Sequence, residues 1–110
     1  MNENPQCPLA GWRVPCGGLL QAHHVVPREW TRGQPAARRA SEVPELIVKV
    51  CANHNAWTKL ADTREARQIL LRHQAHFFGE KAVREALEQI PRKVRGNELT
   101  WDRLMAKGPA

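Results

Sequence analysis

Three cysteines and one histidine are spaced as two half-sites for a metal ion. Cys7 and Cys16 are separated by eight residues, and Cys51 and His54 by two. Three sulfur atoms and one imidazole nitrogen make a closed tetrahedral set of the kind that structural zinc takes, and a two-residue gap is the usual spacing. The first gap is wider than usual, and three buried thiols with a surface histidine are the alternative, because cysteine is commonly buried without any metal. We expect all four residues to bind Zn²⁺.

Two adjacent histidines, His23 and His24, are the second group that could do chemistry. They lie near the end of a short, mostly apolar run, residues 19–26, which Pro27 ends and which is typical of a β-strand. Neighbouring side chains on a strand point to opposite faces, so the pair cannot bind one ion symmetrically. We expect the two histidines to have different functions.

A second predicted strand and a predicted helix must position these side chains. Residues 45–51 are β-rich and short, and we expect this strand to pair antiparallel with the first. The sequence between the strands, residues 28–44, is typical of a long basic loop with room for one turn of helix. After residue 51 the pattern becomes helical, and Asn53 or Asn55 could cap a helix that carries Trp57, Leu60 and Ala61.

The carboxy-terminal half is expected to consist of small helices packed on this strand–strand–helix unit. Thr63 opens a predicted helix that Gly79 ends. Further helices are predicted over residues 81–90 and 99–106. The helix that begins at Thr63 has an apolar stripe on one side that should face the core, formed by Ile69, Leu70, His73, Phe77 and Phe78.

The composition is that of one ordinary globular domain: 110 residues, 42% of them hydrophobic and 25% charged. We expect a single α+β domain over residues 1–110, with a zinc-stabilised core at residues 7–60 and a helical extension at residues 61–110. No apolar run approaches the ~18–20 residues of a membrane helix, and the amino terminus lacks a signal-peptide pattern. We therefore expect no membrane association and a cytoplasmic location, where an odd number of cysteines fits metal binding better than disulfides.

The positive charge of the chain points to nucleic acid as a partner. Seventeen Lys and Arg residues against eleven Asp and Glu give a net charge of +6. A field of this strength attracts polyanions, although positive charge alone also serves solubility, and composition does not decide between the two. The residues that we expect to contact backbone phosphates lie in or after the region between the strands: Arg28, Arg32, Arg38, Arg39 and Lys59.

The order of these features resembles that of the HNH endonucleases, also called ββα-metal or His-Me finger nucleases. The resemblance rests on AHHVVP at residues 22–27 and on VCANHN at residues 50–55, and it covers about residues 7–60. It implies two antiparallel strands and a helix around one catalytic divalent ion, with a zinc knuckle that staples the unit. The helices after residue 60 look loosely like the tail of zinc-knuckle HNH proteins among phage recombination nucleases.

The resemblance implies a role for each matching residue. His24 matches the general base that activates water, and His23 matches the preceding ligand of the catalytic ion. Asn55 matches the helix-borne second ligand, whereas His54 is assigned to the zinc set, which would otherwise lack one ligand. A mixed set of nitrogen and oxygen ligands suits Mg²⁺ or Mn²⁺. The implied activity is hydrolysis of DNA phosphodiester bonds by a monomer or weak dimer that nicks one strand at a time.

The chain departs from the HNH pattern at the middle residue of the motif. No asparagine occurs between His24 and Asn53, and Leu46 or Glu45 stands near the place of the residue that ties down the loop beside the general base. A leucine side chain cannot make those hydrogen bonds, so a backbone carbonyl or Glu45 would have to replace them. Two alternatives stay open: a zinc-knuckle DNA-binding module without catalysis, and an accessory protein of phage recombination or packaging.

Overall fold

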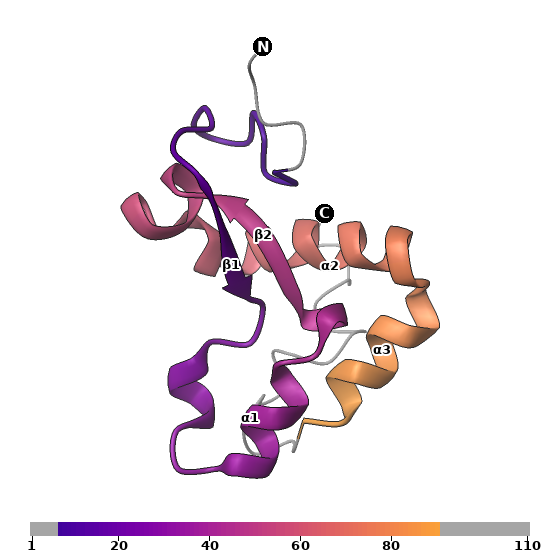
Figure 1. Cartoon of the computed structure of the whole chain (residues 1–110). Coiled ribbons are helices and arrows are strands. Elements are labelled where there is room, and N and C mark those ends of the chain that lie inside the picture. Colours follow the sequence, from indigo (N-terminus) through magenta and orange to yellow (C-terminus); the bar gives the residue numbers. More distant parts are fainter. Residues whose placement is uncertain (1–6, 91–110) are drawn as a thin grey trace.

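A two-stranded antiparallel sheet lies at the centre of the fold, which the computed structural model describes for residues 7–90 (Figure 1). Strand β1 is Leu20–His24 and strand β2 is Ile47–Cys51. Their register places Leu20 opposite Cys51 and His24 opposite Ile47. The two strands and their antiparallel pairing are therefore as predicted from the sequence, and both histidines lie at the end of β1. The strands are shorter than expected, because residues 19, 25–26 and 45–46 lie outside them.

The segment between the strands is more helical than the sequence suggested. It contains a 3₁₀ turn, η1 (Arg28–Thr31), a helix, α1 (Pro35–Ser41), and a second 3₁₀ turn, η2 (Pro44–Leu46). The prediction of a long loop was wrong because Pro35 occupies the first turn of α1, where its fixed φ favours a helix, and alanines and arginines follow it. This segment forms the end of the molecule opposite the amino-terminal loop (Figure 1).

The single helix expected after β2 is broken into two short turns. One π-helical turn, η3 (Asn53–Trp57), is followed by a 3₁₀ turn, η4 (Leu60–Asp62). Lys59 separates them with a φ of 60°, a left-handed conformation that cannot continue a right-handed helix. Neither turn has a side-chain cap, so the predicted capping by Asn53 or Asn55 was wrong.

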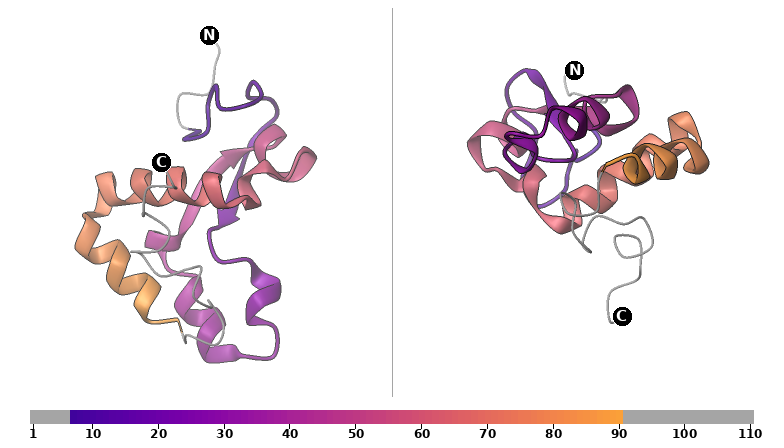
Figure 2. Two further views of the ribbon diagram at one scale, coloured as in Figure 1. Left: turned by 180° about the vertical axis from the view of Figure 1, so that it is seen from behind. Right: turned by 90° about the horizontal axis from the view of Figure 1, so that it is seen from below.

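Two α-helices complete the described chain, α2 (Arg64–Phe78) and α3 (Glu80–Glu88). The Thr63 hydroxyl accepts a hydrogen bond from the Ala66 N–H and so caps α2, which confirms the prediction that a helix begins at Thr63. Gly79 separates the helices with a φ of 92°, as its predicted role as terminator requires. Helix α2 crosses one face of the sheet, behind it in Figure 1 and in front of it in the left view of Figure 2, while α3 turns away from the end of α2.

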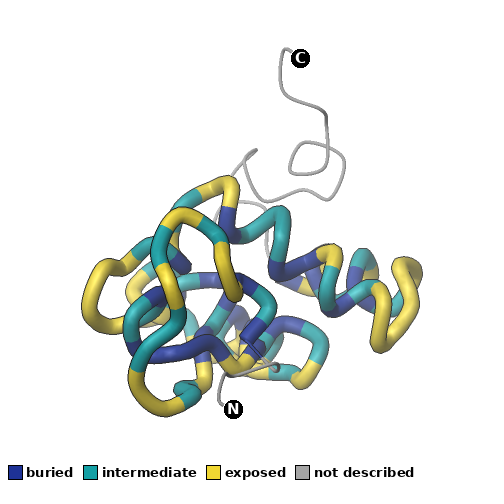
Figure 3. Tube along the Cα trace, turned by 90° about the horizontal axis from the view of Figure 1, so that it is seen from above, coloured by how far each residue is buried: buried dark blue, intermediate teal, exposed yellow. Residues whose placement is uncertain are grey.

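The core lies between the sheet and α2, where the tube in Figure 3 is dark. Helix α2 buries Ala66, Leu70, Leu71 and Gln74 against the strands and η2. The predicted stripe was therefore wrong at its end, because Phe77 is 70% exposed and Phe78 44% exposed. Both phenylalanines instead line an open groove together with Ile47 and Val48 of β2.

These elements make a small α+β unit, in agreement with the expected fold class. Within residues 7–90, no helix is both long enough and apolar enough to cross a membrane. The helix predicted over residues 99–106 lies outside the described residues.

Candidate functional site

The four predicted zinc ligands come together at the end of the sheet nearest the amino terminus. The Sγ atoms of Cys7, Cys16 and Cys51 and a ring nitrogen of His54 all lie within 4.8 Å of one another. The His54 Nδ1 atom is 3.2 Å from Cys51 Sγ and 3.9 Å from Cys16 Sγ. Bonds of about 2.3 Å to a tetrahedral zinc ion set sulfur ligands about 3.8 Å apart, so the observed cluster has the dimensions of such a site. The four residues could hold a metal ion such as zinc.

The surroundings of His54 leave the correct ring nitrogen free for a metal. Its Nε2–H donates a hydrogen bond of 2.8 Å to the Trp12 carbonyl oxygen, and the Trp12 ring stacks on the imidazole. This hydrogen bond assigns the proton to Nε2 and therefore leaves the Nδ1 lone pair facing the three sulfur atoms. Metal-bound histidines are characteristically held in this way, by a carbonyl on the nitrogen that does not bind the ion.

The pKa values of the Cys16 and Cys51 thiols are shifted in opposite directions. The pKa of the Cys16 thiol is raised to about 12, mainly by burial and also by the nearby sulfur atoms of Cys51 and Cys7. Burial also raises the pKa of Cys51, but hydrogen bonds from the backbone of His54 and Gly17 outweigh it and lower that pKa to about 6. Three adjacent thiolates repel one another, and a divalent cation is the charge that would allow all three to ionise. This donor set fits Zn²⁺.

The amino-terminal loop is tied directly to the turn that follows β2. The Asn53 side chain donates a hydrogen bond of 2.7 Å to the Pro15 carbonyl, and its backbone N–H donates one of 2.9 Å to the Gly17 carbonyl. Gly18, with a φ of 79°, approaches Ala52 so closely that a Cβ atom on it would lie 2.6 Å from the Ala52 Cβ. Only glycine fits this position, and the close approach brings Cys16 to Cys51 and His54.

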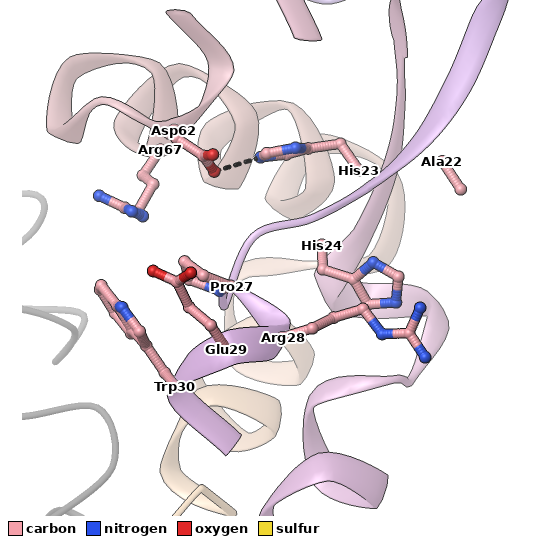
Figure 4. A pocket seen from close by; sticks show the side chains of 9 residues that line it. All are labelled: Ala22, His23, His24, Pro27, Arg28, Glu29, Trp30, Asp62 and Arg67. Atoms are coloured by element: carbon pink, nitrogen blue, oxygen red, sulfur yellow. Dashed lines mark ion pairs between the residues drawn. The ribbon is translucent and has the colours of Figure 1, made fainter. Parts of the chain in front are cut away.

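A second polar cluster lies on the other side of η3, where two predicted catalytic-ion ligands meet. The His23 Nδ1 atom is 3.0 Å from Asn55 Oδ1, although these residues are 32 positions apart in the sequence. His23 is 6% exposed, and its Nε2 atom faces Asp62 across 3.7 Å (Figure 4). Burial lowers the pKa of His23, partly opposed by Asp62 and Asn55, so the ring is neutral and able to donate a lone pair at pH 7.

His24 extends from the opposite side of β1, as the alternation of a strand requires (Figure 4). Its Nε2 atom is 3.8 Å from Glu42 Oε2, which is also 3.4 Å from Arg28 Nη2. Burial lowers the pKa of His24, as do the charges of Arg28 and Arg38, while Glu42 opposes them. A neutral imidazole, 20% exposed, is therefore available at pH 7 to accept a proton from a bound water molecule.

An open pocket of about 470 Å³ joins the two histidines to two arginines. It is lined by His23, His24, Arg28 and Arg67, together with Asp62 and others (Figure 4). Of the five residues predicted to contact phosphates, only Arg28 lines this pocket, whereas Arg32, Arg38, Arg39 and Lys59 are not among its lining residues.

Arg67, on α2, was not among the residues predicted to contact phosphates. In the structure its guanidinium lies 5.1 Å from the centre of the Trp30 ring, and its Nε donates to the Val25 carbonyl. These contacts fix the arginine at the edge of the pocket. The residue spacing along α2 could not predict these contacts, because Trp30 and Val25 belong to the distant segment that follows β1.

The loop before β2 lacks the asparagine of the HNH pattern, and its hydrogen bonds come from elsewhere. Leu46 is buried, and its backbone carbonyl accepts a hydrogen bond of 3.0 Å from the Val25 N–H. Gln74, on α2 and 4% exposed, directs its Nε2 at the carbonyl oxygens of Pro44 and Glu45, at 2.9 and 3.2 Å. The loop beside His24 is thus held by a backbone carbonyl and by a glutamine that sequence reasoning missed.

Replacing Gln74 with methionine is expected to lower the free energy of unfolding by about 1–3 kcal/mol, because the main-chain carbonyl oxygens that its buried amide faces lose their donor while the side-chain volume is kept. Urea denaturation followed by circular dichroism measures this change. Gln89→Met, at an exposed glutamine beyond α3, is the control and should be nearly neutral. Equal stability of the two variants would show that Gln74 does not hold the loop.

No family model, curated protein or solved structure matches the chain. The function is therefore inferred from the two side-chain clusters and the pocket beside them.

Proposed function

We propose that the chain is a metal-dependent DNA endonuclease of the HNH, or ββα-metal, type, with His24 as its general base. The observation that carries the proposal is the meeting of His23 and Asn55 at 3.0 Å beside a pocket that His24 and Arg28 also line. The resemblance implies that a divalent ion, a general base and a phosphate meet in such a pocket. The cysteine–histidine cluster on the other side of η3 supports the proposal, because it fits a zinc knuckle.

The residues of the pocket match the chemical needs of phosphodiester hydrolysis. The neutral His24 ring would accept the proton of the attacking water, and Arg28 and Arg67 would hold the negatively charged phosphate. Mg²⁺ or Mn²⁺, when bound by His23 and its neighbours, would neutralise charge on the phosphate and on the leaving 3′ oxygen. The other residues predicted to contact phosphates would then bind the DNA backbone beside the cleaved bond.

The test is the conversion of supercoiled plasmid to open circles by the zinc-loaded protein with Mg²⁺ or Mn²⁺. One site per chain is expected to cut one strand, so nicked circles should appear before linear DNA. The ends should carry 5′-phosphate and 3′-hydroxyl groups, as the resemblance implies. Absence of nicking by protein that retains its zinc and binds DNA would rule the nuclease out.

The pH dependence of nicking tests the assignment of His24. Because burial and Arg28 lower its pKa below the ordinary value of 6.5, the base form predominates at pH 7 and above. The rate should fall as the pH is lowered through that depressed pKa, because protonated His24 cannot accept a proton. Initial rates at constant ionic strength from pH 5 to pH 8 measure this profile, and a flat profile would argue against histidine as the base.

A DNA-binding zinc module without catalysis is the second candidate, and the missing middle asparagine favours it. This protein would bind DNA with an affinity that falls steeply with salt, because the net charge of +6 acts on phosphates. It would not nick plasmid with any divalent ion. The plasmid assay therefore separates the two candidates, with a gel-shift assay at two salt concentrations beside it.

A further inference from the structure

The two ring nitrogens of His23 have different surroundings. Nδ1 lies 3.0 Å from Asn55 Oδ1, and Asn55 Nδ2 in turn donates a hydrogen bond of 2.9 Å to Gln21 Oε1. Because the amide nitrogen of Asn55 is used by Gln21, its oxygen faces the imidazole, and His23 Nδ1 must carry the proton that this oxygen accepts. The Nε2 atom of the neutral ring is then a free lone pair.

That lone pair is buried and unused within residues 7–90. His23 Nε2 has no hydrogen-bond partner among them, and a buried polar atom without a partner is costly. The nearest charged atom is Asp62 Oδ1, at 3.7 Å, on a side chain that is 54% exposed at the edge of the pocket. This separation is too long for a hydrogen bond, but a small movement of the exposed carboxylate would allow one ion to bridge both atoms.

We propose that His23 Nε2 and the Asp62 carboxylate bind the divalent cation, and that Asn55 holds the His23 ring from its other side. This deepens the proposed function and rests on it, and it gives Asn55 a positioning role in place of the ligand role that the resemblance implied. The same nitrogen cannot both donate to Asn55 and bind an ion, so the observed 3.0 Å contact directs the metal to Nε2.

The open pocket explains why two protein ligands are enough. Nine residues line it, and the space of about 470 Å³ leaves the remaining positions on the ion to water and to a phosphate oxygen. An imidazole nitrogen favours first-row transition metals over Mg²⁺, so Mn²⁺ is the appropriate probe. The ion would lie between the neutral His23 ring and Asp62, with Arg67 close enough to hold the substrate phosphate.

Calorimetric titration of Mn²⁺ into the zinc-loaded, full-length protein without DNA tests the ligand assignment. Asp62→Asn should bind Mn²⁺ about tenfold more weakly or worse, because the amide keeps the shape and removes the charge. Glu29→Gln removes a carboxylate that lines the same pocket and should stay within about threefold of the wild type if direct ligation, and not the general field, sets the affinity. Unchanged binding by Asp62→Asn would overturn the assignment.

Nitrogen-15 NMR of the histidine rings tests the role of Asn55. The Nδ1–H tautomer is expected for His23 before Mn²⁺ is added, and Asn55→Ala should reduce its population while Asp62→Asn should not. Finding His23 in the Nε2–H tautomer would overturn the proposal. Neither measurement involves cleavage, so the metal site and the nuclease can fail separately. If the protein binds Mn²⁺ through Asp62 but never nicks DNA, the metal site stands and the nuclease function is wrong. If Asp62→Asn still nicks DNA and binds Mn²⁺ as the wild type does, the nuclease function stands and the metal site is wrong.

Discussion

Replacing His24 with alanine is expected to slow plasmid nicking by about 10²–10⁴-fold, the usual contribution of a positioned general base. The methyl group of alanine cannot accept the proton of the attacking water. The other histidine that lines the described pocket, His23, extends from the opposite side of β1 and cannot replace His24. His24 does not belong to the cluster of buried hydrophobic residues, so its removal should leave the core intact. The measurement is the initial rate of open-circle formation at equal protein and equal zinc content.

The matched control for this variant is His76→Ala. His76 is an exposed histidine on α2, away from the pocket, and its loss should leave the nicking rate unchanged. Both variants should bind DNA as the wild type does, which separates a lost chemical step from lost affinity. Nicking by His24→Ala at one-tenth of the wild-type rate or more would remove His24 from the chemistry.

Replacing Cys51 with serine is expected to abolish stoichiometric zinc binding and to unfold the amino-terminal half of the described chain. Structural zinc contributes about 10–16 kcal/mol in small zinc domains, as much as the whole free energy of unfolding of an ordinary domain, which is about 5–15 kcal/mol. Cys51 is fully buried at the end of β2, beside the three other ligands. The measurements are zinc content after dialysis and thermal unfolding by circular dichroism.

Chelation of the wild-type protein should have the same effect, and added Zn²⁺ should reverse it. His73→Ala is the control variant, because His73 is a partly buried histidine that packs on Phe77 and lies outside the cluster. It should keep its zinc and lose little stability. If Cys51→Ser melts at the wild-type temperature and neither protein contains zinc, the three cysteines are simply buried thiols.

Signals that act within a few residues made much of the fold predictable. The gap of two between Cys51 and His54, the start of a helix at Thr63 and its end at Gly79 depend on local geometry, and the structure has each of them as expected. The two strands were found because β-rich runs are short and bounded by proline or loops. The helical character of the segment after Pro27 was underestimated as a single turn, because its prolines and glycine resemble those of a loop.

The parts of the candidate site that were missed depend on contacts between distant segments. Gln74 reaches the Pro44 carbonyl across 30 positions, and Asp62 faces His23 only because η4 folds back toward β1. Nothing in a single sequence distinguishes these two residues from other polar residues of the helical half. Arg67 was not predicted as a site residue for the same reason, since its contacts with Trp30 and Val25 are made across the fold.

The π-helical turn at Asn53–Trp57 gives two adjacent residues to two different clusters. His54 points to the cysteines and Asn55 to His23, so one peptide unit links the two sites. A single inserted or deleted residue between Cys51 and Asn55 would rotate one of these side chains away from its cluster. The segment around Gly33, exposed and without a neighbour within 4 Å of a Cβ there, has no such constraint. Length variation in homologous chains should therefore collect between η1 and α1 and be excluded from the turn after β2.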